Sequence, residues 1–239
     1  MKAQFRSLNY LENRMTCFVQ FLLLPAINIL FLTAIVTPYR PQDFWRIATA
    51  SVLLSCSLTV MNAFSDSFTK DRVLGIDREL VAINPWSLYY WGCKTLCCVL
   101  VAAAQGIVNL LLLLLVSGGQ APVLQAFCLL PAMLFAGLSL GFACSVAAWQ
   151  MKNAYFWSNL IAIASNVFSG TILAYTLYPN WMKPIAAILP FGHTLGVLFG
   201  VEHGLFHDVL VSLVWLLAAL VLYRFQIKAI QRKEGFLTL

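Results

Sequence analysis

Charged side chains are scarce in this chain of 239 residues, where Asp, Glu, Lys and Arg together make up 10%. Hydrophobic residues make up 61%, and the mean hydropathy is +0.84. Soluble globular domains carry about 25% charged residues. The composition therefore excludes an ordinary soluble enzyme and predicts an integral membrane protein.

The chain also lacks a phosphate-binding loop, because no Gly-x-x-x-x-Gly-Lys-Ser/Thr sequence occurs in it. It cannot bind ATP in the P-loop manner. The net charge of +6 could suggest nucleic acid, but the basic residues are spread over separate loops without an aromatic stacking platform. We expect no nucleic-acid partner and no cofactor bound by this chain.

Long apolar runs are what the sequence has in abundance. About 20 apolar residues cross ~30 Å of hydrocarbon as a helix, and six segments meet that length. They are residues 15–37, 44–65, 87–116, 122–149, 154–177 and 205–227. The stretches between them are too short to build a soluble core. The predicted fold is all-α, with six transmembrane helices in one membrane domain spanning residues 1–239.

Basic residues predict the orientation, since Lys and Arg near span ends favour the cytoplasmic side. Only Arg40, Arg46 and Lys183 of the 15 Lys and Arg residues would lie opposite the termini. Lys94 is counted on the side of the termini because it can snorkel there from the third span. We expect both termini to be cytoplasmic, in the plasma membrane, which in a bacterium is the cytoplasmic membrane.

Two segments outside the spans have an amphipathic pattern. Residues 1–14 carry apolar side chains at three- and four-residue spacing, which favours an interfacial helix over a frayed basic tail. Residues 66–86 contain an apolar stripe within dense charge, and Asn84-Pro85 should end the helix. That stripe consists of Val73, Ile76, Leu80 and Ile83. A short helix of this kind is suited to dock into a groove of a soluble partner.

Glu79 lies six residues before Pro85-Trp86-Ser87, and Gly92-Cys93-Lys94 follows at the head of the next span. This arrangement resembles the permease subunits of type 2 ATP-binding-cassette exporters. The resemblance implies that residues 66–86 form a coupling helix that contacts a separate ATPase. The coupling residues it implies are Asp71, Arg72, Arg78, Glu79 and Pro85. Two departures are that Gly75 is one residue further from the proline than usual, and that Ile76 replaces the common threonine.

The same resemblance implies the partners. An ATP-binding subunit would carry ATP and Mg²⁺, and a second permease chain, identical or related, would complete the translocation path. The cargo would be amphipathic or hydrophobic, such as a peptide, a toxin or drug, or a lipid-like molecule. A passive channel or an accessory immunity protein is another interpretation, and it predicts no soluble ATPase partner.

Residues 178–204 resemble the family's extracellular segment, with Pro179-Asn180-Trp181 opening a stretch that reaches a second proline, Pro190. A seventh span here would place the C-terminal basic residues outside, against the charge rule. We therefore expect a re-entrant pair of short helices broken at Pro190. Glycines recur at four-residue intervals, which favours close helix packing in an outer gate over a flexible loop. The expected gate residues are Pro190, Gly192, His193, Gly196, Gly200 and Glu202, with Gly204 continuing the glycine series.

One cluster suggests a different function. His203 and His207 would share a helical face beside Glu202 and Asp208, and paired histidines with a carboxylate can bind zinc. The alternative function is a membrane-embedded, metal-dependent hydrolase or lipid-modifying enzyme. A polar surface turn is the simpler interpretation, because the glutamate does not lie between the histidines as it does in zinc proteases.

Overall fold

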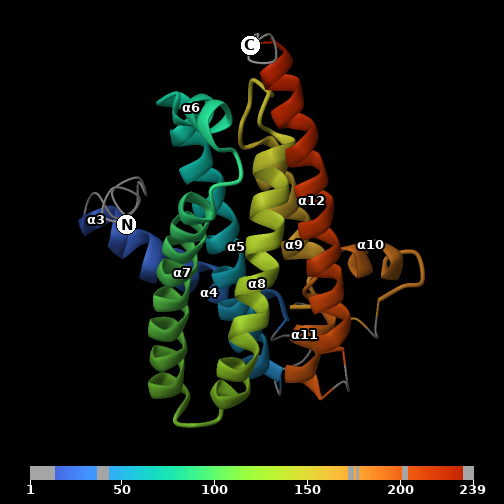
Figure 1. The fold of residues 1–239 in the computed structure, drawn as a ribbon. Helices are drawn as coiled ribbons and strands as arrows, with labels where there is room; N and C mark the ends of the chain where they lie inside the picture. The colour runs from blue at the N-terminus through green and yellow to red at the C-terminus, as the bar shows by residue number, and fades with distance from the viewer. Residues whose placement is uncertain (1–13, 37–42, 172–174, 176–177, 201–203, 234–239) are drawn as a thin grey trace.

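The computed structural model describes residues 14–36, 43–171, 175, 178–200 and 204–233. Within these ranges every regular element is helical, and there is no strand. Figure 1 shows long helices running side by side, with shorter helices at both ends of the bundle. The α-helices are α3 Arg14–Phe18, α4 Leu24–Val36, α5 Phe44–Val73, α6 Ile76–Ile83, α7 Leu88–Ser117, α8 Val123–Ala147, α9 Phe156–Phe168, α10 Lys183–Ile188, α11 Gly192–Gly196 and α12 Leu205–Lys233. A π-helical turn, Val19–Leu23, joins α3 to α4, and a 3₁₀ turn, Val197–Phe199, follows α11.

Four helices among the described residues, α5, α7, α8 and α12, are long and apolar enough to cross a membrane. They correspond to the expected spans 44–65, 87–116, 122–149 and 205–227. The other two expected spans, 15–37 and 154–177, contain shorter apolar helices. The expected helix of residues 1–14 lies almost wholly outside the described residues.

The fifth expected span differs most from the sequence prediction. α9 has 13 residues and ends at Phe168, which gives about 20 Å at 1.5 Å per residue. Gly170 follows with a left-handed φ of 85°, and the hydroxyls of Ser169 and Thr171 lie 3.0 Å apart. A turn therefore interrupts the apolar run, and hydropathy over 154–177 did not reveal it.

The second expected span is longer than predicted. α5 continues through residues 66–73, which the sequence analysis assigned to the following loop. Polar residues in this part of the helix are buried, including Ser67 at 3% and Asp71 at 9% exposure. Because the helix buries these groups against other helices, their polarity does not mark a loop.

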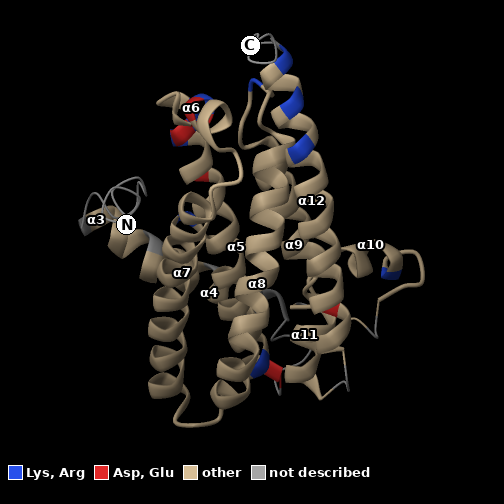
Figure 2. Ribbon diagram, viewed as in Figure 1, with Lys and Arg blue, Asp and Glu red and all other residues tan. Residues whose placement is uncertain are grey.

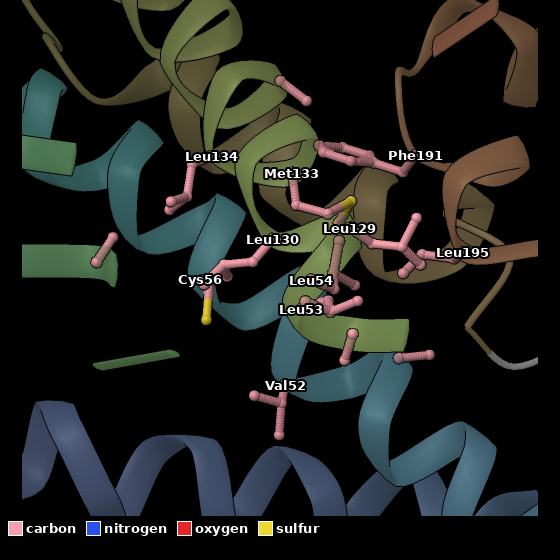
Figure 3. Close-up of a cluster of buried hydrophobic side chains, with 14 of the residues drawn as sticks. Val52, Leu53, Leu54, Cys56, Leu129, Leu130, Met133, Leu134, Phe191 and Leu195 are labelled. Atoms are coloured by element: carbon pink, nitrogen blue, oxygen red, sulfur yellow. The ribbon is translucent and has the colours of Figure 1, made fainter. Parts of the chain in front are cut away.

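α5 is the central helix of the bundle. Of its most apolar 18-residue stretch, 89% is buried, against 17% for α12. Figure 3 shows Leu53 and Leu54 of α5 in one cluster with Leu129 and Met133 of α8, while Phe191 and Leu195 approach from the segment after α10. The segment around α11 thus completes the same core.

Two glycines let α8 lie directly against α5. A Cβ on Gly137 would be 2.2 Å from the backbone oxygen of Ser57, and one on Gly141 would be 2.9 Å from the Cα of Met61. Small residues four apart permit this close approach of helices within membranes. Gly137 and Gly141 therefore fix the packing distance at the centre of the bundle.

Basic residues gather at one end of the described structure, where α6 and the C-terminal part of α12 lie (Figure 2). The last turn of α5 contributes Lys70 and Arg72, and Arg78 belongs to α6. Arg46, paired with Asp43 at 3.5 Å, lies at the opposite end of α5. This uneven distribution is the pattern on which the predicted cytoplasmic side depends.

Candidate functional site

α6 lies across the basic end of the bundle, between α5 and α7 (Figure 1). Gly75 separates it from α5 by adopting a left-handed φ of 75°, a conformation that glycine reaches without a steric penalty. The helix ends at Ile83, with Asn84 as its C-cap. This end agrees with the prediction from Asn84-Pro85. α6 is thus a short, well-bounded helix that packs against α5 and α12.

The face of α6 that packs inward is formed by Asp77, 8% exposed, and Val81, 1% exposed. The apolar stripe seen in the sequence is not this inward face, since Ile83 of α6 is 85% exposed and Val73, the last residue of α5, is 80% exposed. Arg78 and Glu79 are exposed as well. The outer surface at this end therefore combines apolar and charged side chains, while the bundle is contacted by a different set of residues.

Three side chains bind α6 and the turn after it to three long helices. The Trp149 indole, just beyond α8, donates to the Asp77 carboxylate at 2.9 Å. The Tyr223 hydroxyl of α12 donates to the Pro85 carbonyl at 2.6 Å, and the Trp91 indole of α7 donates to the same carbonyl at 3.1 Å. Trp149 and Tyr223 also stack, with ring centroids 5.4 Å apart. A displacement of α6 would therefore act on α7, α8 and α12 together.

A buried ion pair lies directly beneath α6. The Lys94 ammonium donates to the Asp71 carboxylate and, at 2.7 Å, to the Tyr90 hydroxyl, which itself donates to Asp71. Lys94 is 1% exposed, and its Nζ lies 5.4 Å from the Phe68 ring centroid and 5.8 Å from that of Trp91. Charge and aromatic contacts together hold α7 against the end of α5. Lys94 therefore points into the bundle, and its assignment as a snorkelling residue was wrong.

The loop after α8 is also attached to α5. The Arg72 guanidinium donates to the Met151 carbonyl at 2.9 Å. The hydroxyl of Tyr155 lies within hydrogen-bonding reach of Asp66 and Thr69, and burial followed by the negative charge of Asp66 raises the pKa of that hydroxyl. These contacts make the whole basic end one connected unit.

The five expected coupling residues consequently fall into two groups. Asp71, Arg72 and Pro85 form internal contacts, so their side chains or carbonyl hold the end of the bundle together. Arg78 and Glu79 lie on the exposed side of α6. The residues that sequence analysis missed, Trp149 and Tyr223, lie far along the chain, and only their aromatic character near span ends could have indicated them.

The expected outer-gate residues lie at the far end of the bundle. Pro190 separates α10 from α11, while Gly192 and Gly196 begin and end α11. Gly200 adopts a left-handed φ of 75°, so the four glycines do not share one helix face as their spacing suggested. Glu202 lies outside the described residues.

His193 of α11 meets the first turn of α12. Its Nδ1 lies 3.0 Å from Oδ1 of Asp208, and Nδ1 of His207 lies 3.5 Å from the same oxygen. Asp208 is 2% exposed, and its Oδ2 accepts the backbone N–H of Thr194 at 2.6 Å. The sequence analysis paired His207 with His203 instead, and His203 lies outside the described residues.

Comparison with protein-family models, with curated proteins and with solved structures finds no match to this chain. The geometry at the two ends of the bundle is therefore what points to a function.

Proposed function

We propose that this chain is the transmembrane permease subunit of an ATP-driven exporter of the type 2 ATP-binding-cassette class. It would form the translocation path with a second permease chain and would be driven by a separate ATPase subunit. The observation that carries this proposal is the arrangement of α6. Its buried Asp77 is bound by Trp149, the turn after it is bound by Trp91 and Tyr223, and its outer face presents both apolar and charged side chains.

Several features support a soluble partner at this end. Ile83, Arg78 and Glu79 lie exposed on a helix at the basic end of the bundle. An amphipathic helix that lays apolar and charged residues into a groove is a recurring mode of recognition. Because no P-loop occurs in this chain, the energy for transport would have to come from that partner. Closure of the ATPase subunits on nucleotide would push α6, and its hydrogen bonds would pass the movement to α7, α8 and α12.

Grooves beside the long helices support the proposed kind of cargo. α8, α9, α10 and α12 line an open groove of about 450 Å³ with apolar residues such as Leu160, Ile188 and Trp215. A second groove, of about 210 Å³, lies between α5, α7, α8 and α12 and includes Trp91 and Phe142. Apolar linings of this kind support an amphipathic or lipid-like cargo, or acyl chains of the bilayer itself.

The proposal is tested with the triple variant Arg78→Ala/Glu79→Ala/Ile83→Ala. It removes three exposed side chains of α6 and leaves Asp77 and Pro85 in place. We expect the variant to insert and fold normally, to lose most of the co-purifying ATPase, and to lose transport. A matched variant, Lys152→Ala/Arg224→Ala, removes two exposed charges from the same end outside α6 and should keep both. Equal ATPase binding and transport in the two variants would overturn the proposal.

A further inference from the structure

The far end of the bundle brings together three side chains that offer metal ligands. His193 belongs to α11, and His207 and Asp208 belong to the first turn of α12. One ligand atom from each lies within 4.8 Å of the others. We propose that His193, His207 and Asp208 bind a divalent transition-metal ion, with zinc as the reference case.

The distances fit such an ion. Zinc binds imidazole nitrogen and carboxylate oxygen at about 2.0–2.2 Å in a tetrahedral arrangement, which places neighbouring ligand atoms about 3.4 Å apart. The two imidazole nitrogens lie 3.0 and 3.5 Å from Oδ1 of Asp208. All three ligand atoms lie within 4.8 Å of one another, and the half-exposed His207 ring has room to adjust toward a common centre. Two imidazoles and one carboxylate leave a fourth position for water, and this ligand set suits zinc, nickel or copper better than magnesium or calcium.

A hydrogen bond to its second oxygen orients the Asp208 carboxylate. Oδ2 of Asp208 accepts the Thr194 N–H at 2.6 Å, which leaves Oδ1 facing the two imidazoles. Hydrogen bonds of this kind to the outer oxygen orient metal-binding carboxylates. The Asp208 side chain is 3% exposed, whereas those of His193 and His207 are 24% and 47% exposed. An ion from solution can therefore reach the buried Asp208 carboxylate past the two partly exposed imidazoles.

Gly204 is required for this convergence. A Cβ at position 204 would lie 2.1 Å from the Cβ of His193, so any other residue would push that histidine away from α12. The Tyr175 ring supports the other side of the imidazole, with centroids 4.5 Å apart. The bound ion would connect α11 to α12 and stabilise the segment that completes the core. This binding does not depend on the proposed exporter function.

The test uses the full chain in detergent, without ATP or any partner. After treatment with chelator, Co²⁺ is titrated and followed by its visible absorption, and Zn²⁺ is measured by competition. We expect one ion per chain with tetrahedral cobalt bands, and a rise in the thermal midpoint with Zn²⁺ but not with Mg²⁺. In His207→Ala, metal affinity should fall by at least about 100-fold, more than the loss of an outer-shell partner causes. His207→Cys, which keeps a ligand, should recover most of the affinity.

Lys183→Ala, on the neighbouring α10, is the control and should bind metal as the wild type does. Gly204→Ala should weaken binding through displacement of His193, whereas Gly92→Ala, where an added Cβ meets nothing within 4 Å, should not. Wild-type protein that binds no more zinc than His193→Ala/His207→Ala would overturn the proposal. So would full binding in His207→Ala together with its loss in His203→Ala, because a different ligand set would then hold the ion.

Discussion

Two buried carboxylates lie at opposite ends of the bundle and have different partners. Asp71, beneath α6, is met by the Lys94 ammonium and the Tyr90 hydroxyl. Asp208, in the first turn of α12, is met by two imidazoles and one backbone N–H. The ammonium pairs with its carboxylate through charge and offers no lone pair to a metal while it is protonated, whereas imidazole exchanges protons and binds metals near neutral pH.

The difference indicates different tasks for the two ends. The Lys94 ion pair is enclosed by aromatic rings and inaccessible to ligands, with Lys94 1% exposed. A site of this kind fixes the relative position of helices, which a coupling element needs if it is to transmit movement. The His207 side chain is 47% exposed beside its carboxylate. That end is arranged to accept a ligand from solution.

Removal of the ammonium should have the largest effect on stability. Lys94→Met leaves Asp71 buried without its cation, which costs about 3–5 kcal/mol when one partner of a buried ion pair is lost. The thermal midpoint in detergent should fall markedly. The double variant Asp71→Asn/Lys94→Met, which removes both charges, should recover most of the loss, since uncharged replacements of buried pairs are often close to neutral. A single variant as stable as the wild type would show that the two ends do not differ in the way described.

Removal of one hydroxyl beneath α6 should have a smaller effect on stability. Tyr223→Phe deletes the donor to the Pro85 carbonyl, which lies 2.6 Å away, and one hydrogen bond contributes about 1 kcal/mol. The carbonyl keeps the Trp91 indole as a donor, so the fold should survive. We expect a slightly lower thermal midpoint and a larger reduction in the coupling of ATP hydrolysis to transport. Tyr89→Phe, at a side chain 79% exposed, is the control and should change neither quantity.

Apolar run length predicted the helical class and the four helices of membrane length. It failed over 154–177, because it does not detect the turn at Ser169–Gly170–Thr171 that ends the apolar helix early. The end of α6 was also predicted, since Asn84-Pro85 marks it in the sequence, but its start after Gly75 was not, because Val73 belongs to α5. Its inward face was not, because burial depends on Trp149 and other residues distant in the chain.

The glycines illustrate the same limit. The series from Gly192 to Gly204 suggested a continuous packing face. Gly200 instead adopts a left-handed φ, and Gly204 leaves room for the side chain of His193. The close helix contact occurs instead at Gly137 and Gly141, a Gly-x-x-x-Gly pair inside an apolar run that the sequence does contain. Spacing identified candidates, but only the fold determines which glycines face a neighbouring backbone.

Purification from native cells shows whether α6 couples this chain to a soluble ATPase. The tagged chain is isolated in mild detergent, and every protein that remains bound is identified and quantified, for the wild type and for Arg78→Ala/Glu79→Ala/Ile83→Ala. We predict a stoichiometric partner that contains a phosphate-binding loop and that is lost from the triple variant. A folded wild-type chain that retains no such ATPase, above all one that hydrolyses a lipid or peptide substrate with metal and without ATP, would contradict the account.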